Sequence, residues 1–88
     1  MGEKVMVVDD EVSILTLLEY NLMRAGYEVL MATDGLKALR LAEEEHPDLV
    51  ILDLMLPGID GLEVCRKIRE KKMMVPIVML TAKDDEFD

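Results

Sequence analysis

Three aspartates stand at or near the ends of two apolar runs in this sequence, where their carboxylates could do chemistry. Asp9 and Asp10 follow the aliphatic residues 5–8, and Asp53 interrupts a second aliphatic run at residues 49–56. Carboxylate oxygens are hard ligands that favour Mg²⁺ or Mn²⁺ over the softer metals bound by sulfur and imidazole. Aspartate also attacks phosphoryl groups and carries them as a mixed anhydride. These residue types therefore favour a metal site, a phosphoryl acceptor, or both.

Four short apolar runs are predicted to be the strands that position these groups. They cover residues 5–8, 27–32, 48–54 and 76–80. The first, third and fourth are nearly continuous in aliphatic residues and Met, as strands buried on both faces of a parallel sheet are. The second carries Glu28, so we expect an edge strand there. Pro76 opens the fourth run, where its missing N–H is tolerated.

Between these runs the apolar residues recur at helical spacing. The predicted apolar faces of three helices contain Leu15, Leu18 and Leu22; Leu36, Leu39 and Ala42; and Leu62, Cys65 and Ile68. Gly26 should end the first helix, while Thr33 or Asp34 and then Asp60 should begin the other two. The alternation of strand and helix predicts an α/β fold with right-handed crossovers and a parallel sheet covered on both faces.

In open parallel sheets, ligands bind at the carboxyl ends of the strands where the strand order reverses. If the first and third strands are neighbours, as in the flavodoxin-like order, Asp9, Asp10 and Asp53 converge in one crevice. Their repulsion must then be offset by a cation or by protonation. Mg²⁺ is the best match, and Mn²⁺ should replace it. After the fourth strand, the Thr81 hydroxyl and the Ala82 amide are available as donors to phosphoryl oxygens.

Composition excludes several other classes of protein. The 88 residues hold 10 basic and 19 acidic side chains, a net charge of −9, which argues against direct binding to nucleic acid or to an anionic membrane. The single Cys65 forms no internal disulfide, and no Cys or His pair has zinc spacing. Because no signal peptide or membrane-spanning run is present, we expect one cytoplasmic domain.

Several of these residues also have simpler interpretations. Asp9 and Asp10, taken alone, would be assigned to capping the first helix. Asp53 has no helix start within reach, and a buried acid without a role is rare, so its functional interpretation is stronger. For Thr81, an ordinary hydroxyl at a strand end is equally well supported. His46 is expected on the surface, near the end of the second helix.

Three motifs, in order, resemble the receiver domain of bacterial response regulators. They are VVDDE at 7–11, DLMLPGIDG at 53–61 and TAK at 81–83. The sequences of these motifs are most similar to those of the receivers of PhoP-like transcription factors in the OmpR/PhoB subfamily. The resemblance implies a flavodoxin-like doubly wound sheet with strand order 2-1-3-4, and a two-component signalling domain rather than an enzyme.

The resemblance also implies the roles of individual residues. A histidine kinase would phosphorylate Asp53, and Mg²⁺ would be bound by Asp10, Asp53 and the backbone carbonyl of Met55, with Asp9 assisting. Thr81 would be the switch hydroxyl. Pro57, Gly58 and Gly61 would shape the loop that carries the metal-binding carbonyl. A DNA-binding output domain downstream would make the parent protein a transcription regulator.

Relative to this family, residues 1–88 are expected to be a receiver domain truncated at its C-terminal end. Family members continue with a fourth helix, a fifth strand that carries a phosphoryl-contacting Lys, and a fifth helix. Lys83 is not that Lys, because it lies in the loop directly after Thr81. Phosphotransfer and switching are therefore expected to be impaired. The exposed edge of the fourth strand should favour a homodimer or an exchange of elements between copies.

Two alternative functions remain open from the sequence. One is an interaction fragment that binds metal or associates with itself but is not phosphorylated. A less favoured alternative is a Mg²⁺-dependent phosphohydrolase with an aspartyl-phosphate intermediate. That class would normally place a second Asp two residues after the nucleophile, and Met55 stands there instead.

Overall fold

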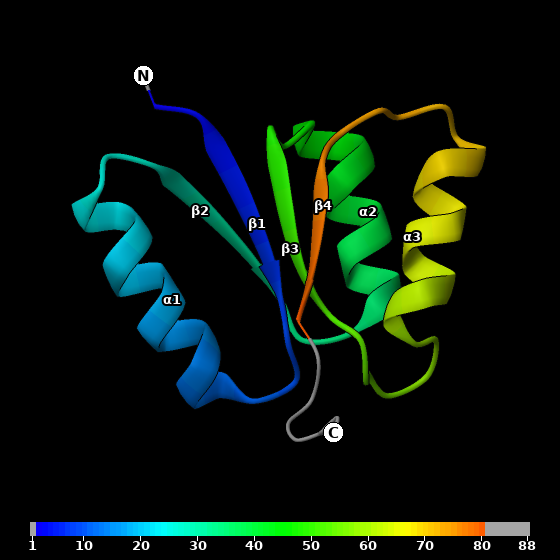
Figure 1. Ribbon diagram of the computed structural model, residues 1–88, viewed down its shortest axis with the longest axis horizontal. Helices are drawn as coiled ribbons and strands as arrows, with labels where there is room; N and C mark the ends of the chain where they lie inside the picture. The colour runs from blue at the N-terminus through cyan, green and yellow to red at the C-terminus, as the bar shows by residue number, and fades with distance from the viewer. Residues whose placement is uncertain (1, 81–88) are drawn as a thin grey trace, which may run out of the picture.

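The computed structural model describes residues 2–80, in which strands and helices alternate along the chain (Figure 1). In chain order these elements are β1 (Lys4–Val8), α1 (Val12–Arg24), β2 (Glu28–Ala32), α2 (Gly35–Glu45), β3 (Leu49–Asp53), α3 (Gly61–Glu70) and β4 (Ile77–Leu80). The sequence KDDEFD at 83–88, whose acids are typical of the opening turn of a further helix, lies outside the described residues. Each observed element corresponds to one predicted from the sequence, and the strand ends differ from the predicted ones by at most one residue.

The strands form one parallel sheet in the order β2-β1-β3-β4, as the resemblance implied. After β1 the chain moves to one side of that strand to form β2, and then crosses to the other side to form β3. The strand order therefore reverses between β1 and β3. Val8 lies opposite both Ala32 and Leu52, so the carboxyl ends of three strands are level at this point.

Helices cover the sheet on both faces, with α1 on one face and α2 and α3 on the other (Figure 1). Alternate residues of β1 face opposite sides of the sheet. Val5 and Val7 pack with Leu15 of α1. Met6 and Val8 pack in the core beneath α2 and α3. All four strand residues are at most 1 % exposed. The unbroken aliphatic run at residues 5–8 is thus explained by burial of β1 on both faces.

At the amino ends of the strands, Lys4 connects β1 to the segment before β3. Its carbonyl accepts a hydrogen bond from the Asp48 N–H at 2.7 Å, and its own N–H donates to Asp48 Oδ2 at 2.8 Å. The Lys4 ammonium also pairs with Glu45 Oε1 at 3.1 Å. These contacts join the amino end of β1 to the segment that leads into β3.

The predicted helix boundaries are largely confirmed. Asp34 and Asp60 are the N-cap residues of α2 and α3, and each carboxylate accepts a backbone N–H three residues later, from Lys37 at 2.9 Å and from Glu63 at 3.0 Å. Gly26 follows α1 with φ of +98°, a left-handed conformation that suits glycine. Among residues 2–80, no helix combines the length and apolar character that a membrane span requires.

The predicted apolar faces of α2 and α3 are wrong at their first turns. Leu36 and Leu62 are 71 % and 63 % exposed, whereas Gly35 and Gly61, the first residue of each helix, are buried. Each glycine comes so close to the loop after β3 that an added Cβ would lie 2.5 Å from its nearest neighbour. The face of each helix that meets the rest of the protein is therefore the one that contains the glycine, and the leucine that follows lies outside it.

We expect Leu52→Ala to lower the free energy of unfolding by about 2–5 kcal/mol, because the Leu52 side chain is fully buried in β3 and its loss leaves a cavity. Leu36→Ala makes the same chemical change at a side chain that is 71 % exposed, and should cost less than about 0.5 kcal/mol. Urea unfolding followed by circular dichroism measures both changes. Equal losses in the two variants would contradict the assigned core.

Candidate metal centre

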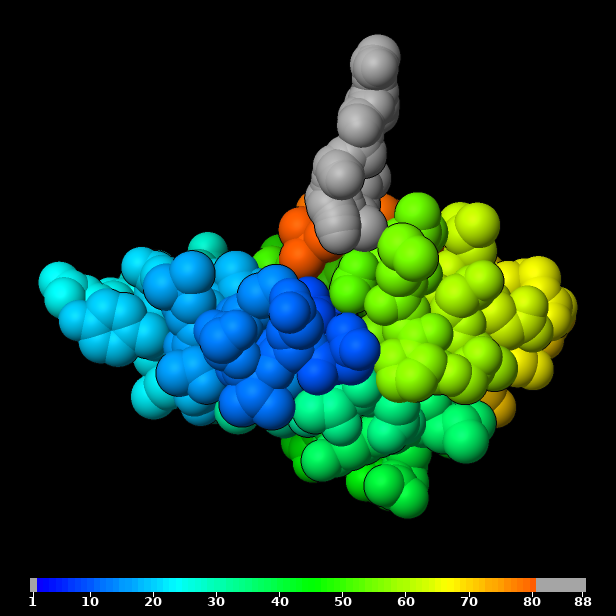
Figure 2. Space-filling view, turned by 90° about the horizontal axis from the view of Figure 1, so that it is seen from below, coloured from blue at the N-terminus to red at the C-terminus, as the bar shows by residue number. Residues whose placement is uncertain are grey.

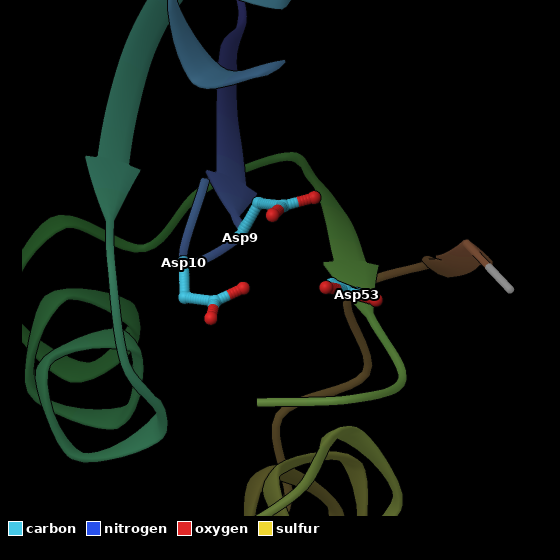
Figure 3. A group of neighbouring side chains, drawn as sticks. All are labelled: Asp9, Asp10 and Asp53. Atoms are coloured by element: carbon cyan, nitrogen blue, oxygen red, sulfur yellow. The ribbon is translucent and has the colours of Figure 1, made fainter. Parts of the chain in front are cut away.

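The three aspartates singled out in the sequence meet at the carboxyl ends of β1 and β3. Asp9 and Asp10 directly follow β1, and Asp53 is the last residue of β3. One carboxylate oxygen from each residue lies within 4.8 Å of those of the other two. Figure 3 shows the three side chains facing a common space between the two strand ends. The predicted convergence of these carboxylates is therefore confirmed.

Each aspartate is held differently. Asp9 extends the β1–β2 ladder through its N–H, which donates to the Ala32 carbonyl at 3.1 Å, and its Oδ1 accepts the Glu11 N–H at 2.9 Å. Asp53 Oδ1 accepts the N–H of Met55 at 3.2 Å. Asp9 is buried, Asp53 is half-buried and Asp10 is exposed. The cluster therefore runs from the protein interior to solvent.

The simpler interpretation of Asp9 and Asp10, as caps of α1, is wrong. The N-cap residue of α1 is Glu11, and no side chain makes a capping hydrogen bond there. The N–H that Asp9 accepts belongs to Glu11 itself and not to the first turn of the helix. Because α1 does not need these carboxylates, another reason must account for two acids at this strand end.

The electrostatics of the cluster are unfavourable in the absence of a cation. Burial raises the pKa of Asp9, the Glu11 N–H partly opposes this, and the carboxylates of Asp53, Asp10 and Glu11 raise the pKa further. In the described part of the chain, no ion pair includes any of the three aspartates. Residues 2–80 therefore supply no paired side-chain cation that offsets this repulsion.

The donor set fits a hard divalent cation. All three side chains offer oxygen, and no His or Cys of residues 2–80 belongs to the cluster. His46 is the exposed C-cap residue of α2, and Cys65 is a half-buried residue of α3 that packs against the core. Mg²⁺ prefers one or two carboxylates and keeps several waters, which suits a cluster with one exposed side. Zinc or copper would favour nitrogen or sulfur donors.

The surroundings of the cluster are seen in Figure 2, which looks onto the end of the molecule where the strands terminate. The segment after β1, in blue, borders those after β2 and β3, in teal and green. Met55 belongs to the segment after β3, and its side chain is 65 % exposed. Its N–H lies against the Asp53 carboxylate, so its backbone runs beside the cluster.

The roles expected of the site residues are not tested by these observations, so metal binding by Asp9, Asp10 and Asp53 and phosphorylation of Asp53 stay predictions. Metal binding by the Met55 carbonyl stays a prediction too. Thr81 and Ala82, the expected donors after β4, lie outside the described residues. Gly35 was not among the residues predicted from the sequence to shape the site, although it shares a sequence signal with Gly61. In both cases an Asp N-cap is followed at once by a glycine, at Asp34-Gly35 and Asp60-Gly61.

Comparisons with known proteins agree with this geometry. The family description "Response regulator receiver domain" matches residues 5–88. The alkaline phosphatase synthesis transcriptional regulatory protein PhoP of Bacillus subtilis is 61 % identical over all 88 residues, which span 37 % of that protein. The chain thus covers about a third of this relative.

Solved structures give the same assignment. The response regulator TrrA of Thermotoga maritima, in complex with Mg²⁺-BeF, is 45 % identical with a TM-score of 0.87, and the match covers 93 % of this chain and 71 % of that one. The BeF3-activated receiver domain of Klebsiella pneumoniae RstA is 37 % identical with a TM-score of 0.85, over 94 % and 70 % of the two chains. Both likenesses extend over nearly the whole chain.

The raised pKa of Asp9 predicts how the metal-free protein responds to pH. A folded-state pKa above the usual 3.8 means that the native state holds the proton to higher pH than the unfolded state, so stability falls as pH rises from about 3.8 through the raised pKa. Asp9→Asn removes this loss while its amide oxygen still accepts the Glu11 N–H. We therefore expect Asp9→Asn to raise the free energy of unfolding at neutral pH without divalent ions.

The matched control is Asp10→Asn, which removes the same charge from an exposed side chain. It relieves only carboxylate repulsion and not burial, so its gain in stability should be smaller. Urea unfolding from pH 4 to pH 8 in a chelating buffer measures both variants. A lower stability of Asp9→Asn than of the unmodified chain at pH 7 would contradict the assigned cost of burying this carboxylate.

Proposed function

This chain belongs to the response regulator receiver domain family, and from that membership we propose that it accepts a phosphoryl group on Asp53. Receiver domains take part in signalling, so the chain is a signalling domain rather than an enzyme. The observation that carries the proposal is the convergence of Asp9, Asp10 and Asp53, whose ligand oxygens lie within 4.8 Å of one another. The phosphoryl donor is a histidine kinase.

Asp53 is suited to the role of nucleophile by its position. It ends the rigid strand β3, it is half-buried, and one of its oxygens is engaged by the Met55 N–H. The other oxygen remains for the phosphorus atom or for metal. In the transfer, a carboxylate oxygen forms a bond to phosphorus while the bond from phosphorus to the donor imidazole nitrogen breaks. The electron pair stays with the imidazole, and the product is an acyl phosphate.

Asp10, Asp53 and the Met55 carbonyl would hold Mg²⁺, with Asp9 assisting from its buried position. When bound, the ion neutralises charge on the carboxylates and on the equatorial phosphoryl oxygens. Without such a cation, an anionic phosphoryl group would approach three carboxylates that already repel one another. The Mg²⁺-BeF complex of the related TrrA supports this assignment by analogy. Thr81 is proposed as the switch hydroxyl that donates to a phosphoryl oxygen.

The partners are proposed from the family and from one relative. PhoP of Bacillus subtilis is named a transcriptional regulatory protein, and this chain spans 37 % of its length. We propose that the parent protein likewise carries a DNA-binding output domain, and that residues 1–88 act as its receiver portion. Measured on these 88 residues alone, transfer and switching are expected to be weaker than in a longer receiver, since the matches cover about 70 % of the solved chains.

The test of phosphoryl acceptance uses acetyl phosphate with Mg²⁺. We expect intact-mass spectrometry to find one phosphoryl group, stable to acid and labile to base, and peptide mapping to place it on Asp53. Asp53→Asn should abolish the adduct, since an amide oxygen is a far weaker nucleophile than a carboxylate. The control Glu44→Gln removes the same charge at an exposed position on α2 and should keep the adduct.

Other results of this experiment would assign other functions. An adduct that persists in Asp53→Asn would contradict the proposed acceptor. Mg²⁺ binding without any adduct would instead support a domain that only binds metal or a partner. Steady release of inorganic phosphate would support a phosphohydrolase.

We also propose that the 88-residue chain associates with a second copy through β4. Within residues 2–80, β4 is paired only with β3, and Val78 on its surface is 48 % exposed. An apolar strand edge of this kind offers unpaired backbone groups to another strand. Pairing of two β4 edges, or exchange of elements between copies, would satisfy them.

Multi-angle light scattering over a range of protein concentrations tests this association. We expect dimers that dissociate on dilution, and we expect Val78→Lys to shift the equilibrium toward monomer because a charge on an edge strand opposes pairing. Leu36→Lys adds the same charge to an exposed position on α2 and should leave the dimer unchanged. A monomer at every concentration would refute the proposed edge pairing.

A further inference from the structure

The helix α3 begins against the backbone of the proposed acceptor residue. A Cβ added to Gly61 would lie 2.5 Å from the carbonyl oxygen of Asp53 and 2.8 Å from the Cα of Leu54. Real Cβ atoms are essentially never found within 3.0 Å of such neighbours. Because both contacts are to backbone, no change of side-chain rotamer could relieve them. The main chain at Asp53 would have to move.

The backbone of Leu54, the residue that follows Asp53, is held from two sides. The Gly61 N–H donates to the Leu54 carbonyl at 2.8 Å, and the Leu54 N–H donates to the Leu80 carbonyl of β4 at 3.0 Å. Leu54 leads directly to Met55, whose N–H contacts the Asp53 carboxylate. Any displacement at Gly61 therefore reaches both Asp53 and the backbone of Met55.

The helix α2 approaches the same loop from another direction. A Cβ on Gly35 would lie 2.5 Å from Cγ1 of Ile59 and 2.8 Å from Cγ2 of Val64. Ile59 belongs to the loop between β3 and α3, and Leu56 of that loop is only 9 % exposed. The loop is thus packed against α2 through side chains and against α3 through backbone.

Gly35 and Gly61 differ from Gly26 and Gly58, two glycines that are explained by their backbone conformation. Gly26 and Gly58 have φ of +98° and +78°, and an added Cβ at either would meet nothing within 4 Å. Gly35 and Gly61 do not have positive φ, so backbone conformation does not account for them. Glycine is required at these positions because neighbouring atoms leave no space for a side chain.

We infer that Gly35 and Gly61 are positioning residues for the metal site: their missing side chains let α2 and α3 close on the loop after β3 and fix Met55 beside Asp53. This inference rests on the proposed function, because it assigns the backbone of that loop to metal binding. Groups that orient metal ligands typically change metal affinity by about 10- to 100-fold when altered. Gly61 acts on the ligand backbone directly, and Gly35 acts through Ile59.

The experiment measures the dissociation constant for Mg²⁺ alone, by amide chemical shifts in nuclear magnetic resonance, so that only folded protein contributes. Gly61→Ala should weaken Mg²⁺ binding by about 10- to 100-fold. Gly35→Ala should weaken it less, because its contacts are to side chains that can shift. Adding Ile59→Ala to Gly35→Ala should recover part of the affinity, since it removes the atom at 2.5 Å.

Gly26→Ala is the control for loss of stability alone. Its φ of +98° is strained for alanine, yet it lies at the end of α1 away from the loop, so Mg²⁺ affinity should stay as in the unmodified chain. Urea unfolding reports the stability of every variant separately. If Gly61→Ala does not fold, Gly35→Ala and its recovery by Ile59→Ala decide the question.

Three outcomes would overturn the inference. Folded Gly61→Ala and Gly35→Ala that bind Mg²⁺ as tightly as the unmodified chain would show that the glycines serve packing only. An equal loss of affinity in Gly26→Ala would trace the effect to stability. An unmodified chain that binds no Mg²⁺ would overturn the proposed metal site itself, and the inference with it.

Discussion

The constraint on which this structure depends is the repulsion among three carboxylates held at the end of a sheet. Asp9, Asp10 and Asp53 come from distant parts of the chain, and nothing in their own chemistry draws them together. They are forced into proximity because β1 and β3 are neighbours and β1 is buried on both faces. The free energy that folds the sheet also holds the acids together, and binding of the proposed divalent cation would relieve their repulsion.

The graded exposure of the cluster follows from where each residue sits. Asp9 still belongs to the hydrogen-bonded ladder of β1 and β2 and is therefore buried, whereas Asp10 is the first residue free of it. Asp53 ends β3 and has one oxygen engaged by backbone. A hydrated ion could thus approach from the side of Asp10 and reach the carboxylates of Asp9 and Asp53, which burial has already partly removed from water. Burial at Asp9 is unfavourable for the isolated carboxylate and would favour the proposed binding of a cation.

The strands, the helix caps and the acidic residues could be predicted from the sequence because each has a local signal. Unbroken aliphatic runs marked β1 and β3, and aspartates marked the starts of α2 and α3. The order of the strands had no local signal and came from the resemblance to a family. The buried faces of α2 and α3 were misjudged at Leu36 and Leu62, because hydropathy does not show that Gly35 and Gly61 lie against a loop from elsewhere in the chain. The capping interpretation of Asp9 failed for a related reason, since a buried position in the sheet competed with a local preference.

The contacts of Lys4 at the far end of the sheet have a consequence for the distances at the metal centre. By joining Lys4 to Asp48, they continue the β1–β3 ladder and add to the contacts that hold its register. A slip of one residue would carry Asp53 about 3.3 Å along the strand and turn its side chain to the opposite face of the sheet. Contacts at the amino ends of the strands, about 16 Å from the acids, therefore help to determine how far apart the carboxylates lie.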